Sequence, residues 1–296
     1  MHPLCRRYWI VCLGLILMPI LAWGQAQVRV VEVWKVNEGL SKPESVVYDA
    51  QRHVLYLSNI NGQGGDKDGN GYITKLAMDG TILSKMWVSG LHAPKGLAIA
   101  NSTLYAADID VLVAIDPDTG KIKARYAAKG AKFLNDVTID SAGHVYVSDS
   151  HTSALYKLSG TDLQVWLQDD DIQQPNGLYA TADALIVAAG DRTADQPGNA
   201  RYLLTVSLPT KAIRPVADRT PIGSLDAAVP DGNGGYFLTD WAAGTLMYYT
   251  PATGPTLLQR FGKGTADLDY VPHTQMLFLP VMMSHELIAL RVEGVD

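Results

Sequence analysis

The stretch FLNDVTIDSAGHVYVSD, residues 133–149, contains the unit that determines the fold. It reads as two short apolar strands separated by a turn, and a third strand follows the small polar residue that ends the second. The same order is found in five further segments, which begin as KPESVVYD (from Lys42), APKGLAIA (from Ala93), QPNGLYAT (from Gln174), SLDAAVPD (from Ser224) and ADLDYVPH (from Ala266). A repeat of this kind indicates an architecture built from one recurring unit.

The third residue of each segment gives the period of the repeat. These residues are Glu44, Lys95, Asn135, Asn176, Asp226 and, in the sixth segment, the apolar Leu268. Successive members are 51, 40, 41, 50 and 42 residues apart, and a four-stranded propeller blade occupies ~40–50 residues. The sequence therefore predicts an all-β fold, namely a six-bladed β-propeller with four-stranded blades.

One additional strand is expected to close the ring of blades. The sixth repeat supplies three strands, whereas the strand VRVVEVWKV at residues 28–36 precedes the first repeat. We expect this strand to complete the sixth blade, because closure removes exposed sheet edges. The propeller then forms a single domain at residues 27–296.

Residues 1–26 have the features of an export signal. Arg6 and Arg7 precede an apolar run at residues 8–23, and small residues follow it, as in secretory signals. The run is shorter than the ~20 residues of a membrane-spanning helix. We therefore expect a cleaved signal and a periplasmic or secreted protein without a stable membrane span, and an uncleaved N-terminal anchor is the alternative.

Composition restricts the partners of the protein. The net charge is −6 and becomes −8 when the two arginines of the signal are removed. Both cysteines, Cys5 and Cys12, also lie in the signal, so the mature chain has no disulfide and no thiolate site. An acidic chain without a Lys/Arg cluster is not expected to bind nucleic acid or anionic membranes. Small molecules, cations and proteins remain as partners, and no pattern indicates an oligomeric state.

Five polar side chains are expected to meet at the axis of the propeller. They are named here the ring residues: Glu44, Lys95, Asn135, Asn176 and Asp226. Innermost strands converge at the axis, where unpaired carboxylates and amides are costly to desolvate. A bound cation would satisfy them, and such oxygen ligands suit Ca²⁺. The alternatives are an ordinary turn at Asn176–Gly177, an ion pair between Lys95 and Glu44, and bound water.

Two long loops are expected on the same face as the ring residues, where they could border a pocket. They are residues 58–72 and 189–201, and the second carries Arg192 and Arg201, which could steer a substrate. Within the first, Asp66–Gly71 (DKDGNG) resembles half of an EF-hand loop, but position twelve is Ala77 instead of Glu. A solvated turn is the favoured interpretation, and a second Ca²⁺ site is the alternative.

Aspartates and histidines near the strand ends have structural and catalytic interpretations. Asp108, Asp149 and Asp240 end their second strands at one repeat position, where a carboxylate typically accepts backbone N–H groups of the next turn. Among the histidines, His151 is the first candidate for a proton acceptor, because it follows Asp149 onto the face of the ring residues. A packed or surface histidine is the alternative.

The segment NDVTIDSAG, Asn135–Gly143, resembles the N-D-G-x-x-D-x-x-G pattern of the regucalcin/gluconolactonase family, and the likeness extends over the mature chain. This family consists of six-bladed propellers that hydrolyse lactones, with paraoxonases as more distant relatives. The resemblance implies Glu44, Asn176 and Asp226 as metal ligands. It also implies that Asn135 is a further ligand or a substrate contact.

The chain departs from the family pattern at three places. Phe133, with Lys132 beside it, stands where the family has Arg, Ala227 replaces the Gly after the fifth-blade Asp, and Ser45 follows Glu44 in place of Gly-Pro. These departures affect the expected sugar-lactone specificity more than the expected metal site.

The resulting hypothesis is a metal-dependent hydrolase of a lactone. Ca²⁺ is the first choice of cation, and Zn²⁺, Mg²⁺ or Mn²⁺ are alternatives. Asp226 or His151 would accept the proton of the attacking water, and Asn135 would stabilise the oxyanion. The expected substrate contacts are Asn135, Lys132, Lys95 and Arg192. The alternative hypothesis is a non-catalytic exported propeller that binds a small ligand or a protein on the same face.

Overall fold

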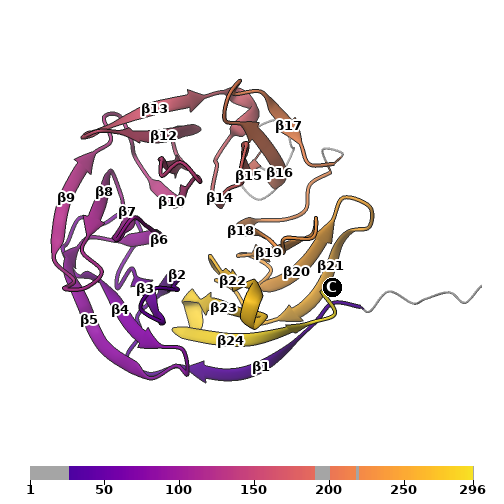
Figure 1. Ribbon diagram of the computed structural model, residues 1–296, viewed down its shortest axis with the longest axis horizontal. Coiled ribbons are helices and arrows are strands. Elements are labelled where there is room, and N and C mark those ends of the chain that lie inside the picture. The colour runs from indigo at the N-terminus through magenta and orange to yellow at the C-terminus, as the bar shows by residue number, and fades with distance from the viewer. Residues whose placement is uncertain (1–26, 191–200, 218–219, 296) are drawn as a thin grey trace, which may run out of the picture.

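The computed structural model describes residues 27–190, 201–217 and 220–295, and the proposed export signal at residues 1–26 lies outside them. The described chain forms six four-stranded sheets, which are arranged as blades around a central axis (Figure 1). The helical elements in it are the short 3₁₀ helices η1 (Asp170–Ile172), η2 (Pro272–Thr274) and η3 (Met282–Ser284). The predicted all-β six-bladed propeller is confirmed.

Each blade is an antiparallel sheet whose strands follow one another from the axis outward. Blade one consists of β2 (Pro43–Asp49), β3 (Val54–Asn59), β4 (Gly71–Ala77) and β5 (Ile82–Leu91). Blade two consists of β6 (Pro94–Ala100), β7 (Thr103–Asp108), β8 (Val111–Ile115) and β9 (Ile122–Ala127). Blade three consists of β10 (Leu134–Ile139), β11 (Val145–Asp149), β12 (Ala154–Ser159) and β13 (Asp162–Gln168). Blade four consists of β14 (Leu178–Ala180), β15 (Ala184–Gly190), β16 (Arg201–Ser207) and β17 (Ile213–Pro215). Blade five consists of β18 (Leu225–Pro230), β19 (Tyr236–Asp240), β20 (Thr245–Thr250) and β21 (Gly254–Arg260). Blade six consists of β22 (Asp269–Val271), β23 (Met276–Val281), β24 (Glu286–Glu293) and β1 (Arg29–Val36).

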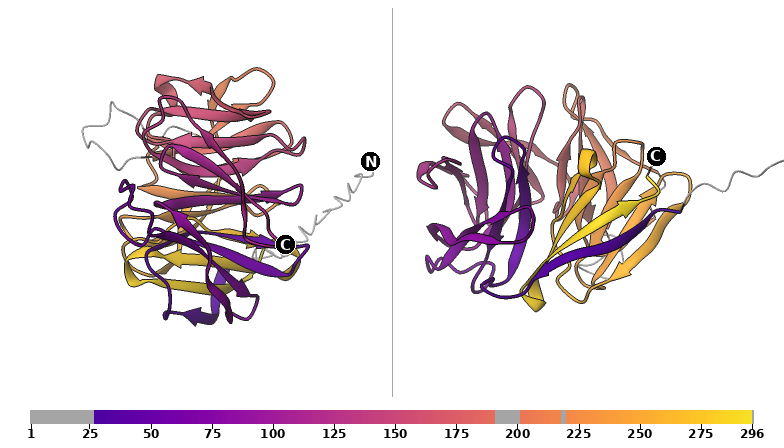
Figure 2. Two further views of the ribbon diagram at one scale, coloured as in Figure 1. Left: turned by 90° about the vertical axis from the view of Figure 1, so that its left-hand side faces the viewer. Right: turned by 60° about the horizontal axis from the view of Figure 1, so that its bottom comes forward.

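The strand that precedes the first repeat closes the ring, as predicted. β1 pairs antiparallel with β24, from Arg29 opposite Glu293 to Val36 opposite Leu287, and the two strands run side by side in both views (Figures 1 and 2). An exposed ion pair of 2.6 Å between Arg29 and Glu293 lies at one end of this pairing. Closure gives β24 a partner on both edges and makes β1 the outer strand of blade six.

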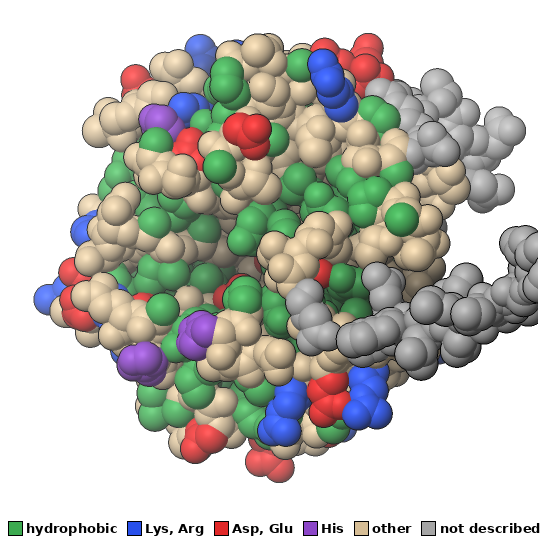
Figure 3. Space-filling view, turned by 45° about the vertical axis from the view of Figure 1, so that its right-hand side comes forward, with side chains coloured by type: hydrophobic (Ala, Val, Ile, Leu, Met, Phe, Trp, Pro, Cys, Tyr) green, Lys and Arg blue, Asp and Glu red, His purple; other side chains and the backbone are tan. Residues whose placement is uncertain are grey.

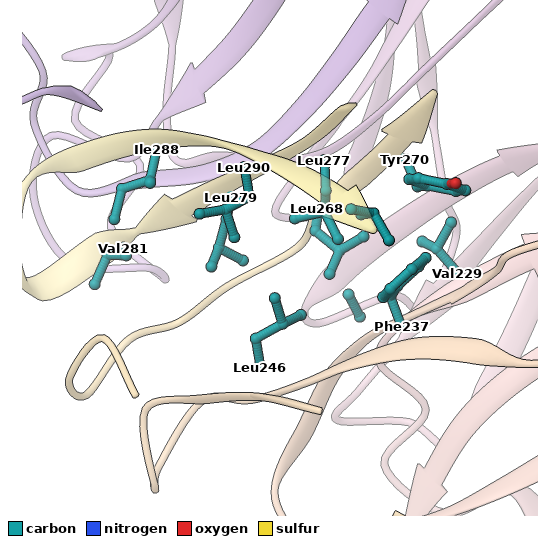
Figure 4. Close-up of a cluster of buried hydrophobic side chains, with 12 residues drawn as sticks. Val229, Phe237, Leu246, Leu268, Tyr270, Leu277, Leu279, Val281, Ile288 and Leu290 are labelled. Atoms are coloured by element: carbon teal, nitrogen blue, oxygen red, sulfur yellow. The ribbon is translucent and has the colours of Figure 1, made fainter. Parts of the chain in front are cut away.

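The hydrophobic core lies between neighbouring blades. All six residues of β3 are buried, because the inner strands have a sheet on both faces and therefore read as continuous apolar runs. In the cluster between blades five and six, Phe237 and Leu246 pack with Leu277, Leu279 and Ile288 (Figure 4). Burial of this kind, at about 25 cal/mol per Å² of apolar surface, holds the ring together and fixes the residues that point to its axis.

Candidate functional site

The five ring residues line one cavity at the end of the central axis. The cavity has a volume of about 420 Å³, and its wall includes Glu44, Lys95, Asn135, Asn176 and Asp226. Residues 62–64 of the first long loop also line it, which confirms that this loop borders the pocket. Side chains that are up to 182 residues apart in the sequence are therefore brought to one site by the repeat.

In four of the six blades, a β-bulge at the start of the innermost strand presents the ring residue to the axis. In these blades the pairing of the first two strands is interrupted over the ring residue and the residue after it. The interruptions fall at Pro43/Val46, Pro94/Leu97, Leu134/Val137 and Leu225/Ala228. A bulge leaves residues out of the ladder and redirects their side chains. The repeated bulge thus explains why residues at one repeat position face one cavity.

Blade six corrects one expectation from the sequence. Thr265 pairs with Val281 as Pro43 pairs with Asn59 in blade one, so Ala266 and not Leu268 occupies the ring position of this blade. Leu268 is buried in the hydrophobic cluster between blades five and six. The prediction for this residue was wrong because an apolar side chain two positions further along the strand packs between the sheets instead of facing the axis.

Two glycines allow the innermost strands to approach one another closely. A Cβ atom on Gly96 would lie 2.5 Å from Cα of Asp136, and one on Gly177 would lie 2.3 Å from the carbonyl oxygen of Asp226. Distances this short are not tolerated between real atoms. The Asn176–Gly177 pair therefore has a packing requirement at the axis beyond the needs of a turn.

Two buried carboxylate oxygens in the cavity have no hydrogen-bond partner within the described residues. They are Oε2 of Glu44 and Oδ2 of Asp226, and both side chains belong to residues that are 6% exposed. The other carboxylate oxygen of Asp226 accepts a hydrogen bond from Nδ2 of Asn176. Buried polar atoms are normally paired, so these two oxygens identify the place where a further group, such as a cation, would bind.

Burial dominates the electrostatics of these carboxylates. It raises the pKa of Glu44 well above the usual range, and the nearby Asp226 raises it further. Burial also raises the pKa of Asp226 to about 6, against the opposing effects of the Arg201 guanidinium and the Asn176 amide. A carboxyl that is buried without a counter-charge favours its neutral form, and a bound cation would reverse this preference.

The side-chain amides of Asn135 and Asn176 both donate to protein neighbours. Nδ2 of Asn135 donates to Oγ of Ser150 at 3.0 Å, and Nδ2 of Asn176 donates to Asp226. The donors therefore point to protein neighbours, and the amide oxygens remain for a ligand among the described residues. No group of three or more His, Cys, Asp or Glu side chains arranged to hold a metal occurs in this part of the chain, so a cation here would depend on the two amide oxygens.

Lys95 is buried in the wall of the cavity and does not form the alternative ion pair. Its Nζ donates to the carbonyl oxygens of Gly64 at 2.8 Å and Ala93 at 3.1 Å, and it lies 4.2 Å from the ring centroid of Phe133. Burial lowers the pKa of Lys95 to about 8. In the described structure no salt bridge links Lys95 to Glu44, so the glutamate is not neutralised by direct contact.

A second cavity of about 380 Å³ adjoins the first and contains His151. The two cavities share Phe133, Asn135 and Arg201 in their walls. The imidazole of His151 is exposed and stacks on Phe133 with ring centroids 4.5 Å apart. His151 therefore lies beside the cavity of the ring residues and not among the groups that line it.

Two further predicted site residues, Lys132 and Arg192, and the EF-hand-like turn are placed as follows. Lys132 is exposed and lines neither cavity, although its backbone N–H bonds to Asp149 at 2.7 Å. Arg192 lies outside the described residues. In the turn with the EF-hand-like sequence, the Asp68 carboxylate accepts from the Asn70 backbone and side chain, which fits a solvated turn.

The repeated aspartates have the structural role that the sequence indicates. Asp108 accepts the backbone N–H groups of His92 and Ala93 at 2.8 to 3.0 Å. Asp149 accepts four such groups, from residues 132, 133, 151 and 152, and Asp240 accepts those of residues 242 and 243. The prediction is confirmed for Asp149 and Asp240, whereas Asp108 accepts from the segment that precedes β6 and not from the turn that follows it.

A second layer of carboxylates below the ring residues was not predicted. Asp136 accepts the backbone N–H groups of Val137 and Leu178, both at 2.6 Å, and burial raises its pKa to about 7. Asp267 accepts from Oγ of Ser45 at 2.7 Å. Each follows a ring position directly, so the period could have revealed Asp136, whereas Asp267 required the register of blade six.

A third cavity, of about 210 Å³, lies further along the innermost strands at the opposite end of the axis. Its wall contains Asp136, Asp267 and Asp269 among apolar side chains. A hollow in which acidic side chains lie at depth among hydrophobic ones is visible in the space-filling view (Figure 3). This end of the axis is therefore acidic, which favours cations over anions there, whereas the wall of the ring-residue cavity also contains Lys42, Lys95 and Arg201.

The fold and the site define a class of protein, a six-bladed propeller with a carboxylate–amide pocket at its axis. The model of the SMP-30/gluconolactonase/LRE-like region matches residues 42–260. The chain therefore belongs to this family, as the segment at residues 135–143 indicated.

Solved structures share the fold at low sequence identity. The chain is similar to a gluconolactonase from Xanthomonas campestris, with 15% identity, a TM-score of 0.68, and coverage of 90% of this chain and 91% of that chain. It is also similar to virginiamycin B lyase from Staphylococcus aureus, with 13% identity, a TM-score of 0.59, and coverage of 90% and 99%. No curated protein matches the sequence. In the described part of the chain, no helix has the length and apolar character of a membrane span.

Proposed function

We propose that the protein is an exported, cation-dependent lactonase that opens a cyclic ester to a hydroxy acid. The observation that carries this proposal is the pair of unpartnered, buried oxygens of Glu44 and Asp226 in one cavity. Membership of a family that includes gluconolactonases supports the choice of a lactone as substrate.

The cation would be held by the carboxylates of Glu44 and Asp226 and by the amide oxygens of Asn135 and Asn176. This donor set consists of hard oxygens, which suit Ca²⁺ better than the softer metals. When bound, the cation would supply Lewis acidity toward the ester carbonyl and the attacking water.

Asp226 is the proposed proton acceptor. It lies in the cavity, and with a pKa of about 6 it is ionised at neutral pH, so it can take the proton of water as the oxygen attacks the carbonyl carbon. The ring C–O bond then breaks, and the alcohol oxygen leaves with the proton that Asp226 accepted. His151 is less well placed for this role, because it does not line the cavity of the ring residues.

Lys95 and Asn135 are placed to stabilise negative charge on the carbonyl oxygen. Two of the three N–H groups of the Lys95 ammonium are engaged with backbone carbonyls, which leaves one for a substrate oxygen. Asn135 similarly has a second amide N–H beside the one that it donates to Ser150. Fixed donors of this kind act strongly in a cavity from which water is excluded.

A lyase reaction is the second candidate, because virginiamycin B lyase shares the fold. In the solved structure of that lyase, a histidine-to-alanine substitution makes the enzyme catalytically inactive. Among the described residues of the present chain, no histidine lines the cavity that holds the ring residues. This difference favours hydrolysis over elimination for the present chain.

A panel of sugar and aliphatic lactones, assayed by pH-stat with and without EDTA, tests the proposal. Each hydrolysed lactone releases one acid equivalent, so we expect acid release that stops with EDTA and returns when Ca²⁺ is added. Stoichiometric cation binding without acid release from any lactone would instead indicate a non-catalytic binding protein.

A further inference from the structure

The cavity of the ring residues has an apolar wall on one side. Ile60, Trp241 and Met282 line it, and each directly follows the second strand of its blade: β3, β19 and β23. The three backbone N–H groups make equivalent hydrogen bonds, to the carbonyl oxygens of residues 42, 224 and 264. Blades five, six and one are neighbours in the closed ring (Figure 1), so these side chains lie on the same side of the cavity.

The apolar wall is buried at the base of the cavity, around Ile60, and exposed at its mouth, around Met283. Ile60 is 4% exposed and forms a small buried cluster with Ala93 and Ile109, against which Met282 packs. Met283 lines the same cavity but is 49% exposed. An unbranched methionine at the mouth of a pocket can adjust to apolar groups of different shape.

In blade three the equivalent position holds Ser150, whose N–H bonds to the carbonyl oxygen of Phe133 and which lines the adjoining cavity instead. Arg201 borders the cavity beside it. The pocket therefore has carboxylates and amides at its base and an apolar wall of Ile60, Trp241, Met282 and Met283. Further polar lining groups are Lys42, Gln63, Arg201 and Ser224.

This division does not suit a substrate with hydroxyl groups around its whole ring. Of the wall residues, only Trp241 has a polar side-chain atom, an N–H donor. Hydroxyl groups buried against the others would lose their hydrogen bonds to water without replacement, which is unfavourable. Phe133 stands where the family has Arg. Nζ of Lys95 lies over the Phe133 ring, and the imidazole of His151 stacks on it.

We propose that the substrate is a lactone with an apolar substituent, which lies against the wall formed by Ile60, Trp241, Met282 and Met283. This inference rests on the proposed lactonase function and specifies its substrate class. The ester group would face the ring residues at the base, while the alkyl or aryl substituent would extend toward the mouth.

The test compares δ-lactones that carry no substituent, a propyl group or a pentyl group on the ring carbon bonded to oxygen, together with glucono-δ-lactone. We expect kcat/KM to rise by about two- to fourfold for each methylene that the wall covers, and the sugar lactone to be the poorest substrate. In Met283→Ser, the ratio of kcat/KM for the pentyl and unsubstituted lactones should fall at least about threefold.

Met86→Ser is the matched control, because Met86 is 52% exposed on β5 and does not line the cavity. It should keep the wild-type ratio. Hydrolysis of all lactones without dependence on chain length, or preference for glucono-δ-lactone, would overturn the inference but leave the lactonase function intact. If no lactone is hydrolysed, the proposed lactonase function is wrong. Calorimetry with the corresponding lactams then tests whether the apolar wall binds the substituent. Tighter binding of the pentyl lactam than of the unsubstituted lactam would support this role, and equal binding would refute it.

Discussion

Asp226→Asn is expected to lower kcat/KM for lactone hydrolysis by at least about a thousandfold, since general-base catalysis and cation binding are both lost. The substitution keeps the shape of the side chain but removes the negative charge and the proton acceptor. It leaves a group that can still contact Asn176, so the bulge at the start of β18 should persist. Steady-state kinetics in saturating Ca²⁺ measure the effect.

Asp183→Asn provides the control, because Asp183 is exposed and lines neither of the adjoining cavities. It should retain wild-type activity. Circular dichroism and thermal unfolding of Asp226→Asn should show a folded propeller. Full turnover by this variant would remove Asp226 from the mechanism, whereas an unfolded variant would be replaced by Asp226→Ser, for which the same loss is expected.

The cation-free protein is expected to lose stability as the pH rises from 5 to 8. Burial raises the pKa of Asp226 and Asp269 to about 6 and that of Asp136 to about 7, and it raises the pKa values of Glu44 and Asp267 as well. The folded state therefore holds more protons than the unfolded chain in this range, and stability falls where the unfolded state binds fewer protons. Asp269 alone should lower the free energy of unfolding by about 1.4 kcal/mol over this pH range.

Urea unfolding at several pH values, with EDTA or with Ca²⁺, measures this dependence. Ca²⁺ should restore the stability at pH 8, because it stabilises the ionised form of the carboxylates that it contacts. Asp269→Asn should reduce the slope without changing the response to Ca²⁺, since Asp269 lies at the other end of the axis. Stability that is constant or rises between pH 5 and 8 without cation would show that the axial carboxylates are not held in a desolvated state.

The architecture could be predicted because a propeller repeats one unit. The period placed Glu44, Asn135 and Asp226 at the same position of their blades, and a closed ring brings equal positions to the axis. The closing role of residues 28–36 followed from the missing strand of blade six. The prediction failed at Leu268, because the sixth blade has no polar ring residue and its alignment depends on a bulge that hydrogen bonds alone reveal.

The wall and the neighbourhood of each ring residue could not be predicted in the same way. Ile60, Trp241 and Met282 share a position in the fold that Ser150 occupies in blade three, so the repeat alone does not predict an apolar residue there. His151 follows a strand on the correct face, but its direction depends on stacking with Phe133. Contacts of this kind involve side chains from different blades, and their geometry is set by packing and not by spacing.

A crystal structure of the protein grown with Ca²⁺ tests most directly whether distant carboxylates hold one cation. We expect a single ion at the axis, within about 2.3–2.6 Å of Oε2 of Glu44 and Oδ2 of Asp226, with the amide oxygens of Asn135 and Asn176 turned toward it. An axis without an ion at saturating Ca²⁺, or an ion bound only at the Asp66–Gly71 turn, would contradict the proposed site.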